Sequence, residues 1–376
     1  MDIMERLAPG YLGFLRRISL METPSENKDS LDAMAGVIRD FAVERGFAVE
    51  RIPFPAAGDF LHIRLPGAPE LQPVLLMAHM DTVHAIGAFG LDVLREEDNW
   101  LCGPGVLDCK GGIVTALMTM EVLRESGCRR GVSLLLTSDE EISGRLSGEE
   151  GYALMRQYAV ASCAVFNCEV GKEGELTVGR KGIVRLRVDV SGIAAHAGNA
   201  YFSGASAIRE AASQILQIES GSSEDGCTFN CGVIHGGTTA NTVPDHCSFV
   251  VDIRAMKEQT LNEGVERVKR LAETVSVPGT SCAVIVVSSR PPMEHREAND
   301  ALLETINRSA RAIGQEPLRP IVRGGGTDAA YTVQAGAPTV CSCGMTGSGE
   351  HTLRERVDMN SLIPRVALLS HTILSL

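Results

Sequence analysis

The sequence LLMAHMDTVH, residues 75–84, ends an apolar run in side chains that bind metals. The apolar residues 74–78 predict a short buried strand, and His79 follows at its carboxyl end. Asp81 lies two residues further on, close enough to accept the imidazole N–H and to fix the tautomer that binds a metal. Because open α/β sheets form their ligand crevices at the carboxyl ends of strands, we expect His79 and Asp81 in such a crevice.

Four further stretches place acidic or imidazole side chains after apolar segments or in glycine-containing turns. They are GVLDCKGG (105–112), TSDEEISG (137–144), NCEVG (167–171) and GSGEHT (347–352). Together with the first stretch they supply His79, Asp81, Asp108, Glu140, Glu141, Glu169 and His351. Carboxylate and imidazole ligands, with no cysteine required, suit a pair of zinc-like ions with a water between them. The sequence therefore predicts a metallohydrolase.

Each stretch alone has an ordinary explanation. A His and an Asp can share a polar turn, Asp108 can cap the helix after Gly112, and adjacent glutamates are usually solvated. Buried adjacent carboxylates, however, repel each other and need a cation or a proton. One of Glu140 and Glu141 can then bind a metal while the other acts as general base and general acid. The recurrence of the pattern after several strands favours the metal site.

The order of the expected elements predicts an α/β fold with two domains. Strands at 47–52, 60–65, 74–78, 132–137 and 163–167, with helices at 112–125 and 152–158, predict a largely parallel sheet flanked by helices. An earlier helix is expected to begin at Ser30 as its N-cap. Between Gly182 and residue 290 the order becomes βαββαβ, which is typical of ferredoxin-like domains. We therefore expect a catalytic domain of residues 1–181 and 291–376, interrupted by a lid and dimerisation domain of residues 182–290.

Composition narrows the partners and the location. The 376 residues are 44% apolar, and the net charge of −12 would repel a polyanion, so no nucleic-acid partner is expected. The eleven cysteines are odd in number and irregularly spaced, which predicts reduced thiols. No signal peptide is evident, and no apolar run reaches the roughly 18 residues of a membrane span. We expect a cytoplasmic protein with no membrane association.

Over nearly its whole length the chain resembles the M20 family of metallopeptidases, and within it the glutamate carboxypeptidase branch. Related members of that family include acetylornithine deacetylase, succinyl-diaminopimelate desuccinylase and aminoacylase. The resemblance rests on MAHMDTVH, GPGVLDCKGG, TSDEEISG, GGGTDAA and the late histidine loop. It implies two divalent ions, with Zn²⁺ favoured over Co²⁺ or Mn²⁺. By this resemblance His79, Asp108 and Glu169 hold one ion, while Asp108, Glu141 and His351 hold the other, with Glu140 as general acid and base and Asp81 orienting His79.

The same resemblance extends to the predicted lid. SGIAAHAGN places His196 as a donor to the developing oxyanion, supplied in many members by the partner subunit of a dimer. TTANTVP and VDIR place Asn241 and Arg254 at positions that resemble substrate-holding residues. Gly324, Gly325 and Gly326 would offer backbone N–H groups to a substrate carboxylate. A turn residue, a surface charge and a tight loop are the ordinary alternatives, and the role of Arg323 stays open.

The function expected from these features is hydrolysis of an amide whose amine side carries a free carboxylate. A carboxypeptidase that releases a C-terminal amino acid, glutamate favoured, comes first; an N-acyl amino acid deacylase and a dipeptidase are the alternatives. A metal-stabilised dimeric binding protein would lack the base or a ligand, and here Glu140 and every expected ligand are present. A transferase or carbohydrate hydrolase with paired carboxylates and no metal would not need histidines at strand ends. A homodimer formed through the lid domain is also expected.

Overall fold

The computed structural model describes residues 3–376, which divide into two compact units. The first unit contains the chain up to Gly179, together with His295–Val322 and Thr327–Leu376. The second unit contains Arg180–Glu294 and Arg323–Gly326. The expected division into a catalytic domain and a lid and dimerisation domain stays a prediction. Within residues 3–376, no helix has both the length and the apolar character needed to cross a membrane.

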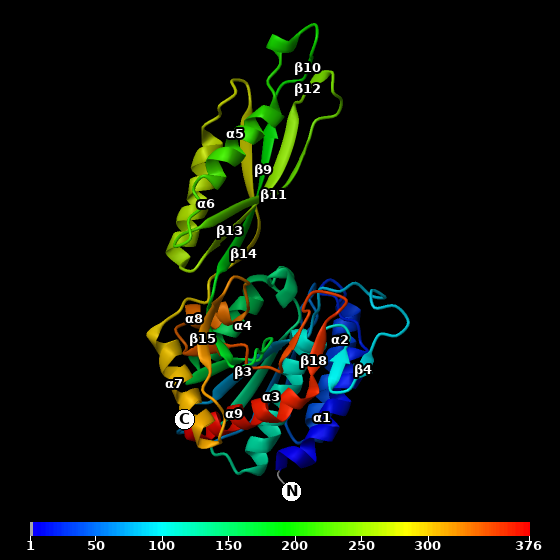
Figure 1. Ribbon diagram of the computed structural model, residues 1–376, viewed down its shortest axis with the longest axis vertical. Helices are drawn as coiled ribbons and strands as arrows, with labels where there is room; N and C mark the ends of the chain where they lie inside the picture. Colours follow the sequence, from blue (N-terminus) through cyan, green and yellow to red (C-terminus); the bar gives the residue numbers. More distant parts are fainter. Residues whose placement is uncertain (1–2) are drawn as a thin grey trace. The chain divides into compact units, whose positions relative to one another are not determined.

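An eight-stranded sheet forms the centre of the first unit (Figure 1). Its order is β1 (Ala48–Ile52), β2 (Phe60–Leu65), β6 (Val132–Thr137), β3 (Val74–His79), β7 (Ala164–Asn167), β16 (Thr339–Cys341), β8 (Glu175–Arg180) and β15 (Arg319–Arg323). The central strands β6, β3, β7 and β16 pair in parallel. The pairs β1 with β2, β2 with β6, and β16 with β8 are antiparallel. The predicted parallel sheet is thus confirmed at its centre, where the site residues emerge.

Helices cover both faces of this sheet because its strands are apolar on both sides. The helices are α1 (Ile3–Ser19), α2 (Lys28–Glu44), α3 (Gly111–Glu125), α4 (Gly148–Val160), α7 (Glu297–Ala312), α8 (Ala329–Gln334) and α9 (Leu362–Ser375). Leu76 of β3 belongs to the core shared with α1, α2, α3, α7 and α9. Its neighbours Leu75 and Met77 belong to the opposite core, shared with α4 and α8. This alternation follows from the two-residue period of a strand.

Helix α3 is buried along almost its entire length. It packs beside α1 and α9 and against β3, so apolar residues lie all round it rather than on one face (Figure 1). Its first turn lies close to the end of β7, because a Cβ at Gly112 would stand 1.8 Å from the carbonyl oxygen of Cys168. Only glycine at position 112 therefore allows the first turn of α3 to lie this close to Cys168, and the preceding segment Val106–Lys110 is kinked at Asp108 and Cys109.

A second, smaller sheet in the first unit was not expected from the sequence. Its order is β17 (Gly347–Ser348), β18 (Arg356–Asp358), β5 (Trp100–Cys102) and β4 (Arg95–Glu97). Strands of two or three residues are too short to show a hydrophobic period. The turn between β17 and β18 carries His351. Short 3₁₀ turns lie at Glu140–Ile142, Tyr201–Ser203 and Met359–Ser361.

The second unit is a four-stranded antiparallel sheet with two helices on one face (Figure 1). The strand order is β11 (Thr228–Gly236), β13 (His246–Ala255), β9 (Gly182–Ser191) and β14 (Ser281–Arg290), and the helices are α5 (Ala207–Glu219) and α6 (Glu258–Glu273). A two-stranded sheet joins β10 (Ala195–His196) to β12 (Thr242–Val243). Alternate residues such as Val188 and Val251 face the helices. The predicted βαββαβ order and ferredoxin-like sheet are confirmed.

The expected start of the second helix was wrong by about one turn. Helix α2 begins at Lys28, and its N-cap is Asn27, whose side-chain oxygen accepts the N–H of Ser30 at 3.0 Å. Ser30 lies inside the first turn and its hydroxyl donates to the Asn27 carbonyl at 3.0 Å. Both residue types cap helices well, and the earlier one was overlooked.

None of the eleven cysteines forms a disulfide within residues 3–376, as the sequence predicts.

Candidate metal centre

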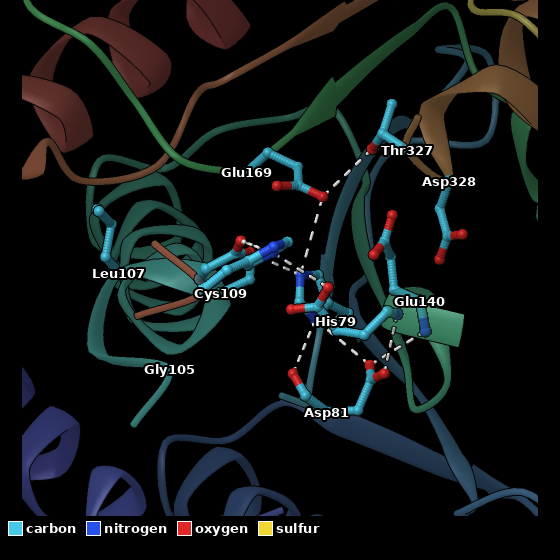
Figure 2. Close-up of polar contacts among 12 residues, drawn as sticks. His79, Asp81, Gly105, Leu107, Cys109, Glu140, Glu169, Thr327 and Asp328 are labelled. Carbon is cyan, nitrogen blue, oxygen red and sulfur yellow. Dashed lines mark hydrogen bonds and ion pairs between the residues drawn. The ribbon is translucent and has the colours of Figure 1, made fainter. Parts of the chain in front are cut away.

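The carboxyl ends of the parallel strands bring buried polar side chains together. His79 ends β3, Glu169 follows β7, and Glu140 opens the turn after β6. All three side chains are buried. In Figure 2, the carboxylates of Glu140 and Glu169 approach the His79 ring from different sides. The strand-end pattern in the sequence thus corresponds to one cluster in space.

The first group of candidate ligands surrounds the Nε2 atom of His79. This atom lies 3.0 Å from Oδ1 of Asp108 and 3.8 Å from Oε1 of Glu169. On the other side of Asp108, its Oδ2 atom lies 3.2 Å from Nε2 of His351, and that nitrogen lies 3.3 Å from Oε2 of Glu141. Asp108 therefore turns one oxygen toward each histidine, which is the arrangement that a ligand shared by two ions requires.

The electrostatics of the cluster fit divalent cations. Burial, followed by repulsion from Asp108, raises the pKa of Glu141 to about 8. Hydrogen bonds to Asp108 and Glu141 raise the pKa of His351 to about 11. Oε1 of Glu141 is also buried without a hydrogen bond. The carboxylates favour the protonated form of His351, and one of their buried oxygens has no hydrogen-bond donor. The cluster therefore needs more positive charge than its side chains provide, and metal ions would supply that charge.

Two groups of three residues each place their potential ligand atoms within 4.8 Å of one another, and the groups share His79. One is His79, Asp108 and Glu141; the other is His79, Glu140 and Glu169. Glu140 thus lies as close to the cluster as a ligand would, although the sequence predicts it as the base. This position is compatible with a metal ligand and with a base beside a metal ion.

Asp81 holds more of the centre than predicted. Its Oδ1 lies 3.3 Å from Nδ1 of His79, while its backbone oxygen lies nearer, at 3.0 Å. The carboxylate also accepts the backbone N–H groups of Glu140 and Glu141 at 3.1 and 3.0 Å, and the hydroxyl of Ser25 at 2.6 Å. Asp81 therefore connects His79, the turn that contains Glu140 and Glu141, and Ser25. Figure 2 shows its contacts with His79 and with that turn.

Glu355 is a buried carboxylate that the sequence did not reveal. It is 1% exposed and accepts the backbone N–H groups of Gly105, Leu107 and Asp108 at 3.1, 2.9 and 2.9 Å. Nε2 of His84 lies 3.2 Å from the same carboxylate. Glu355 thus fixes the backbone that carries Asp108. No sequence motif surrounds Glu355. Its position four residues after His351 is the one signal by which it could have been found.

Thr327 and Asn167 position Glu169 and were also missed. The Thr327 hydroxyl donates to Oε1 of Glu169 at 3.2 Å (Figure 2). Nδ2 of Asn167 donates to the Thr327 hydroxyl at 2.8 Å. Thr327 directly follows the three glycines. The motif GGGTDAA therefore supplies a loop and also the hydroxyl that holds Glu169.

In the second unit, His196 lies on β10, and Asn241 precedes its partner strand β12. The N–H of Ala197 donates to the Asn241 carbonyl at 2.9 Å, so the structure places these two predicted residues near each other. Nδ1 of His196 accepts the N–H groups of Gly198 and Asn199, both at 3.1 Å. A neutral imidazole with Nδ1 as acceptor carries its proton on Nε2. The exposed Nε2 of His196 is therefore a hydrogen-bond donor.

Arginines gather around the predicted glycine loop. Arg254 donates to the Gly324 carbonyl at 2.9 Å and to Asp252 at 2.7 Å. Arg180 donates to the Gly326 carbonyl at 3.4 Å, and a Cβ at Gly326 would stand 2.9 Å from Cδ of Arg290. Arg180 and Arg290 are both buried, and neither was singled out from the sequence.

Gly324 has open space where a Cβ would lie, and Gly325 has only an arginine nitrogen at 3.8 Å, so the steric need for glycine is at Gly326. Nη2 of Arg323 is buried without a hydrogen bond, which leaves its role open.

The chain is similar to several known proteins. Residues 75–375 match the sequence profile of Peptidase family M20/M25/M40. Carboxypeptidase G2 of Pseudomonas sp. (strain RS-16) is 27% identical over 376 residues, covering 98% of this chain and 89% of that protein. Acetylornithine deacetylase of Shigella sonnei (strain Ss046) is 26% identical over 281 residues, covering 69% and 71%. The aminopeptidase PepT of Bacillus cereus ATCC 10987 shares the fold, with a TM-score of 0.81, 22% identity and 98% of each chain covered.

Replacing Glu355 by Gln tests its positioning role. The amide has nearly the same shape, but its NH₂ group faces backbone donors, so we expect the free energy of unfolding to fall by about 1 to 3 kcal/mol. Metal content should fall as well, because Asp108 loses its support. The control is Glu97→Gln on the exposed strand β4. Equal metal content and urea unfolding in both variants would contradict the role of Glu355.

Proposed function

The chain belongs to Peptidase family M20/M25/M40, and from this premise we propose that it is a carboxypeptidase that releases a C-terminal amino acid, with glutamate favoured, from peptides or N-acyl amino acids. As a member of this family it is a metal-dependent hydrolase. The observation that carries the proposal is Asp108, whose two oxygens face two different histidines. The name of the relative carboxypeptidase G2, similar over 98% of this chain, supports a carboxypeptidase.

We assign the predicted ligands to two ion sites. His79, Asp108 and Glu169 would hold one ion; Asp108, Glu141 and His351 would hold the other. We propose Zn²⁺ at both sites, with Co²⁺ and Mn²⁺ as alternatives, because the donors are imidazoles and carboxylates. Ions in these sites would act as Lewis acids, which makes water more acidic and a scissile carbonyl more electrophilic.

Glu140 is the proposed general base and general acid. Its backbone N–H is held by Asp81 at 3.1 Å, and its carboxylate lies within 4.8 Å of the His79 and Glu169 ligand atoms. Glu141 instead faces His351, at 3.3 Å. Both glutamates approach His79, but Glu140 also approaches Glu169 whereas Glu141 approaches Asp108 and His351, which supports separate tasks. Glu140 would take the proton of the attacking water and return it to the leaving amine.

The second unit supplies the proposed substrate contacts. The Nε2–H of His196 would donate to the oxyanion that develops on the carbonyl oxygen, because its Nδ1 is occupied by backbone N–H groups. Asn241, in the neighbouring strand connection, is proposed as a further polar contact. Arg254 and the loop Gly324–Gly326 would bind the free carboxylate of the substrate. The additional guanidinium groups of Arg180 and Arg290 beside the loop support recognition of an acidic residue such as glutamate.

An N-acyl amino acid deacylase is the nearest alternative. The relative acetylornithine deacetylase, 26% identical over 69% of this chain, has a name that describes such a reaction. A dipeptidase would use the same centre. A non-catalytic binding protein is disfavoured because Glu140 and all expected ligands lie in one cluster.

We also propose a homodimer formed through the second unit. Strands β11 and β14 are the edges of its sheet, and both expose apolar side chains, including Val233 and Ile234 on β11 and Val286 on β14. Pairing of an edge strand with a second copy would cover such residues. The expectations of a cytoplasmic location and of no nucleic-acid or membrane partner stay predictions.

A substrate panel tests the proposed reaction. Peptides ending in glutamate, aspartate or a neutral residue, and N-acetyl amino acids, are assayed with added Zn²⁺, Co²⁺ or Mn²⁺. We expect C-terminal glutamate to be released with the highest kcat/KM. Faster hydrolysis of N-acetyl amino acids would favour the deacylase, and release from amidated C-termini would contradict carboxylate recognition.

Glu140→Gln tests the base. The amide fits the same space but cannot accept a proton, so turnover should fall by about 10² to 10⁴-fold while metal content stays unchanged. The control is Glu150→Gln, at an exposed position on α4, which should retain full activity. Loss of metal in Glu140→Gln comparable with that in Glu141→Ala would show that the two roles are reversed.

Mixed dimers test whether His196 acts in the partner subunit. A His196→Ala chain and a Glu140→Gln chain are each expected to be nearly inactive. After subunit exchange, random pairing makes half of the dimers mixed, each with one complete site, so about a quarter of wild-type activity should return. Exchange is checked with differently tagged subunits. Confirmed exchange without recovery would mean that His196 does not act across the dimer.

A further inference from the structure

Residues of the His351 turn and of the small sheet line a hollow that the proposed reaction does not use. Its volume is about 390 Å³, and it is lined by Arg95, Cys102, Ser348, Gly349, Arg354 and Arg356. Three of these six residues are arginines, and none is acidic. All of them belong to the first unit.

The register of the small sheet explains why the arginines meet. Ser348 pairs with Arg356, Arg356 pairs with Cys102, and Cys102 pairs with Arg95. Residues directly opposite on neighbouring strands point to the same face, so these four side chains form one row across four strands. The backbones of Arg356 and Arg95 are therefore about 10 Å apart, on either side of the Cys102 thiol.

The hollow has an unbalanced positive charge. The chain has a net charge of −12, and some of its exposed arginines form ion pairs, as Arg129 does with Glu70. By contrast, no ion pair within residues 3–376 involves Arg95, Arg354 or Arg356. Like charges that converge without a counter-ion repel each other, and a bound anion relieves that repulsion.

One guanidinium is already oriented. Nε of Arg356 donates to the Ser348 hydroxyl at 3.2 Å, and its guanidinium lies 4.4 Å from the centre of the Trp100 ring. The acidic side chains of this face, Glu97 and Asp358, stand in the next row, opposite Trp100. The hollow therefore contains one oriented guanidinium, that of Arg356, and two others, and the carboxylates of this face lie in a different row.

We propose that this hollow binds a compact oxyanion with two or more negative charges, such as sulfate, phosphate or a phosphate monoester. Arg95, Arg354 and Arg356 supply charge-assisted hydrogen bonds, and their planar guanidinium groups match the oxygen spacing of such anions. The bound anion joins β4 to the turn between β17 and β18. Because that turn also carries His351 and Glu355, occupancy holds the segment that supports Asp108. The binding site itself does not depend on the proposed reaction.

Calorimetric titration of the purified full-length protein with sodium sulfate, at ionic strength held constant with sodium chloride, tests the site. We expect one sulfate per chain, and an increase of at least about tenfold in Kd for both Arg95→Gln and Arg354→Gln, because each loses a charge-assisted bond. The matched control is Arg129→Gln, which removes an exposed arginine elsewhere and should leave the Kd unchanged. Absence of binding, or equal binding by all of these variants, would overturn the proposal.

Two further arms sharpen this result. An Asp-Asp dipeptide with free termini carries the same net charge as sulfate in an extended form, and tighter binding of this peptide than of sulfate would overturn the assignment to a compact oxyanion. Hydrogen exchange of residues 349–355 should slow when sulfate is added to the wild type and stay unchanged in Arg354→Gln. Binding without slower exchange would overturn the proposed support of the His351 turn. Circular dichroism confirms that the variants remain folded.

Discussion

The concentration of negative charge around Asp108 is the constraint on which the first unit depends. Four carboxylates and two imidazoles meet where strands of the central sheet end, and Asp108 faces both histidines. Such a cluster is costly without cations, because burial and then repulsion from Asp108 raise the pKa of Glu141 to about 8. The surrounding residues supply the order that the cluster cannot supply for itself. Asp81 holds the backbone of both glutamates, Glu355 holds that of Asp108, and Thr327 holds Glu169.

Elements with clear periodicity, and the ligands at their ends, were predictable from the sequence. The bounds of β2 and β6 agree with the expected ones, and His79 was placed correctly at the end of β3. These predictions succeed because buried strands are continuously apolar and a change to polar residues marks their ends. The family resemblance supplied the grouping of ligands into two ion sites, and that grouping stays a prediction.

What escaped prediction depends on contacts between distant parts of the chain. Glu355 lies 247 residues after Asp108, and Thr327 lies 158 residues after Glu169, so no local spacing connects them. The small sheet escaped because its strands are too short to show a period. Arg180 and Arg290 became visible only when the chain brought them beside Gly326. A single charged residue in a sequence is usually a surface residue, and burial is what distinguishes these two.

The central claim is that Asp108 is shared by two metal ions, and elemental analysis of two purified variants tests it most directly. His351→Ala removes a ligand of one site only, so it should retain about one ion per chain, whereas Asp108→Ala removes a ligand of both and should retain almost none. The wild type should hold about two. If Asp108→Ala retained as much metal as His351→Ala, the carboxylate would not be a shared ligand, and the account of the centre would be wrong.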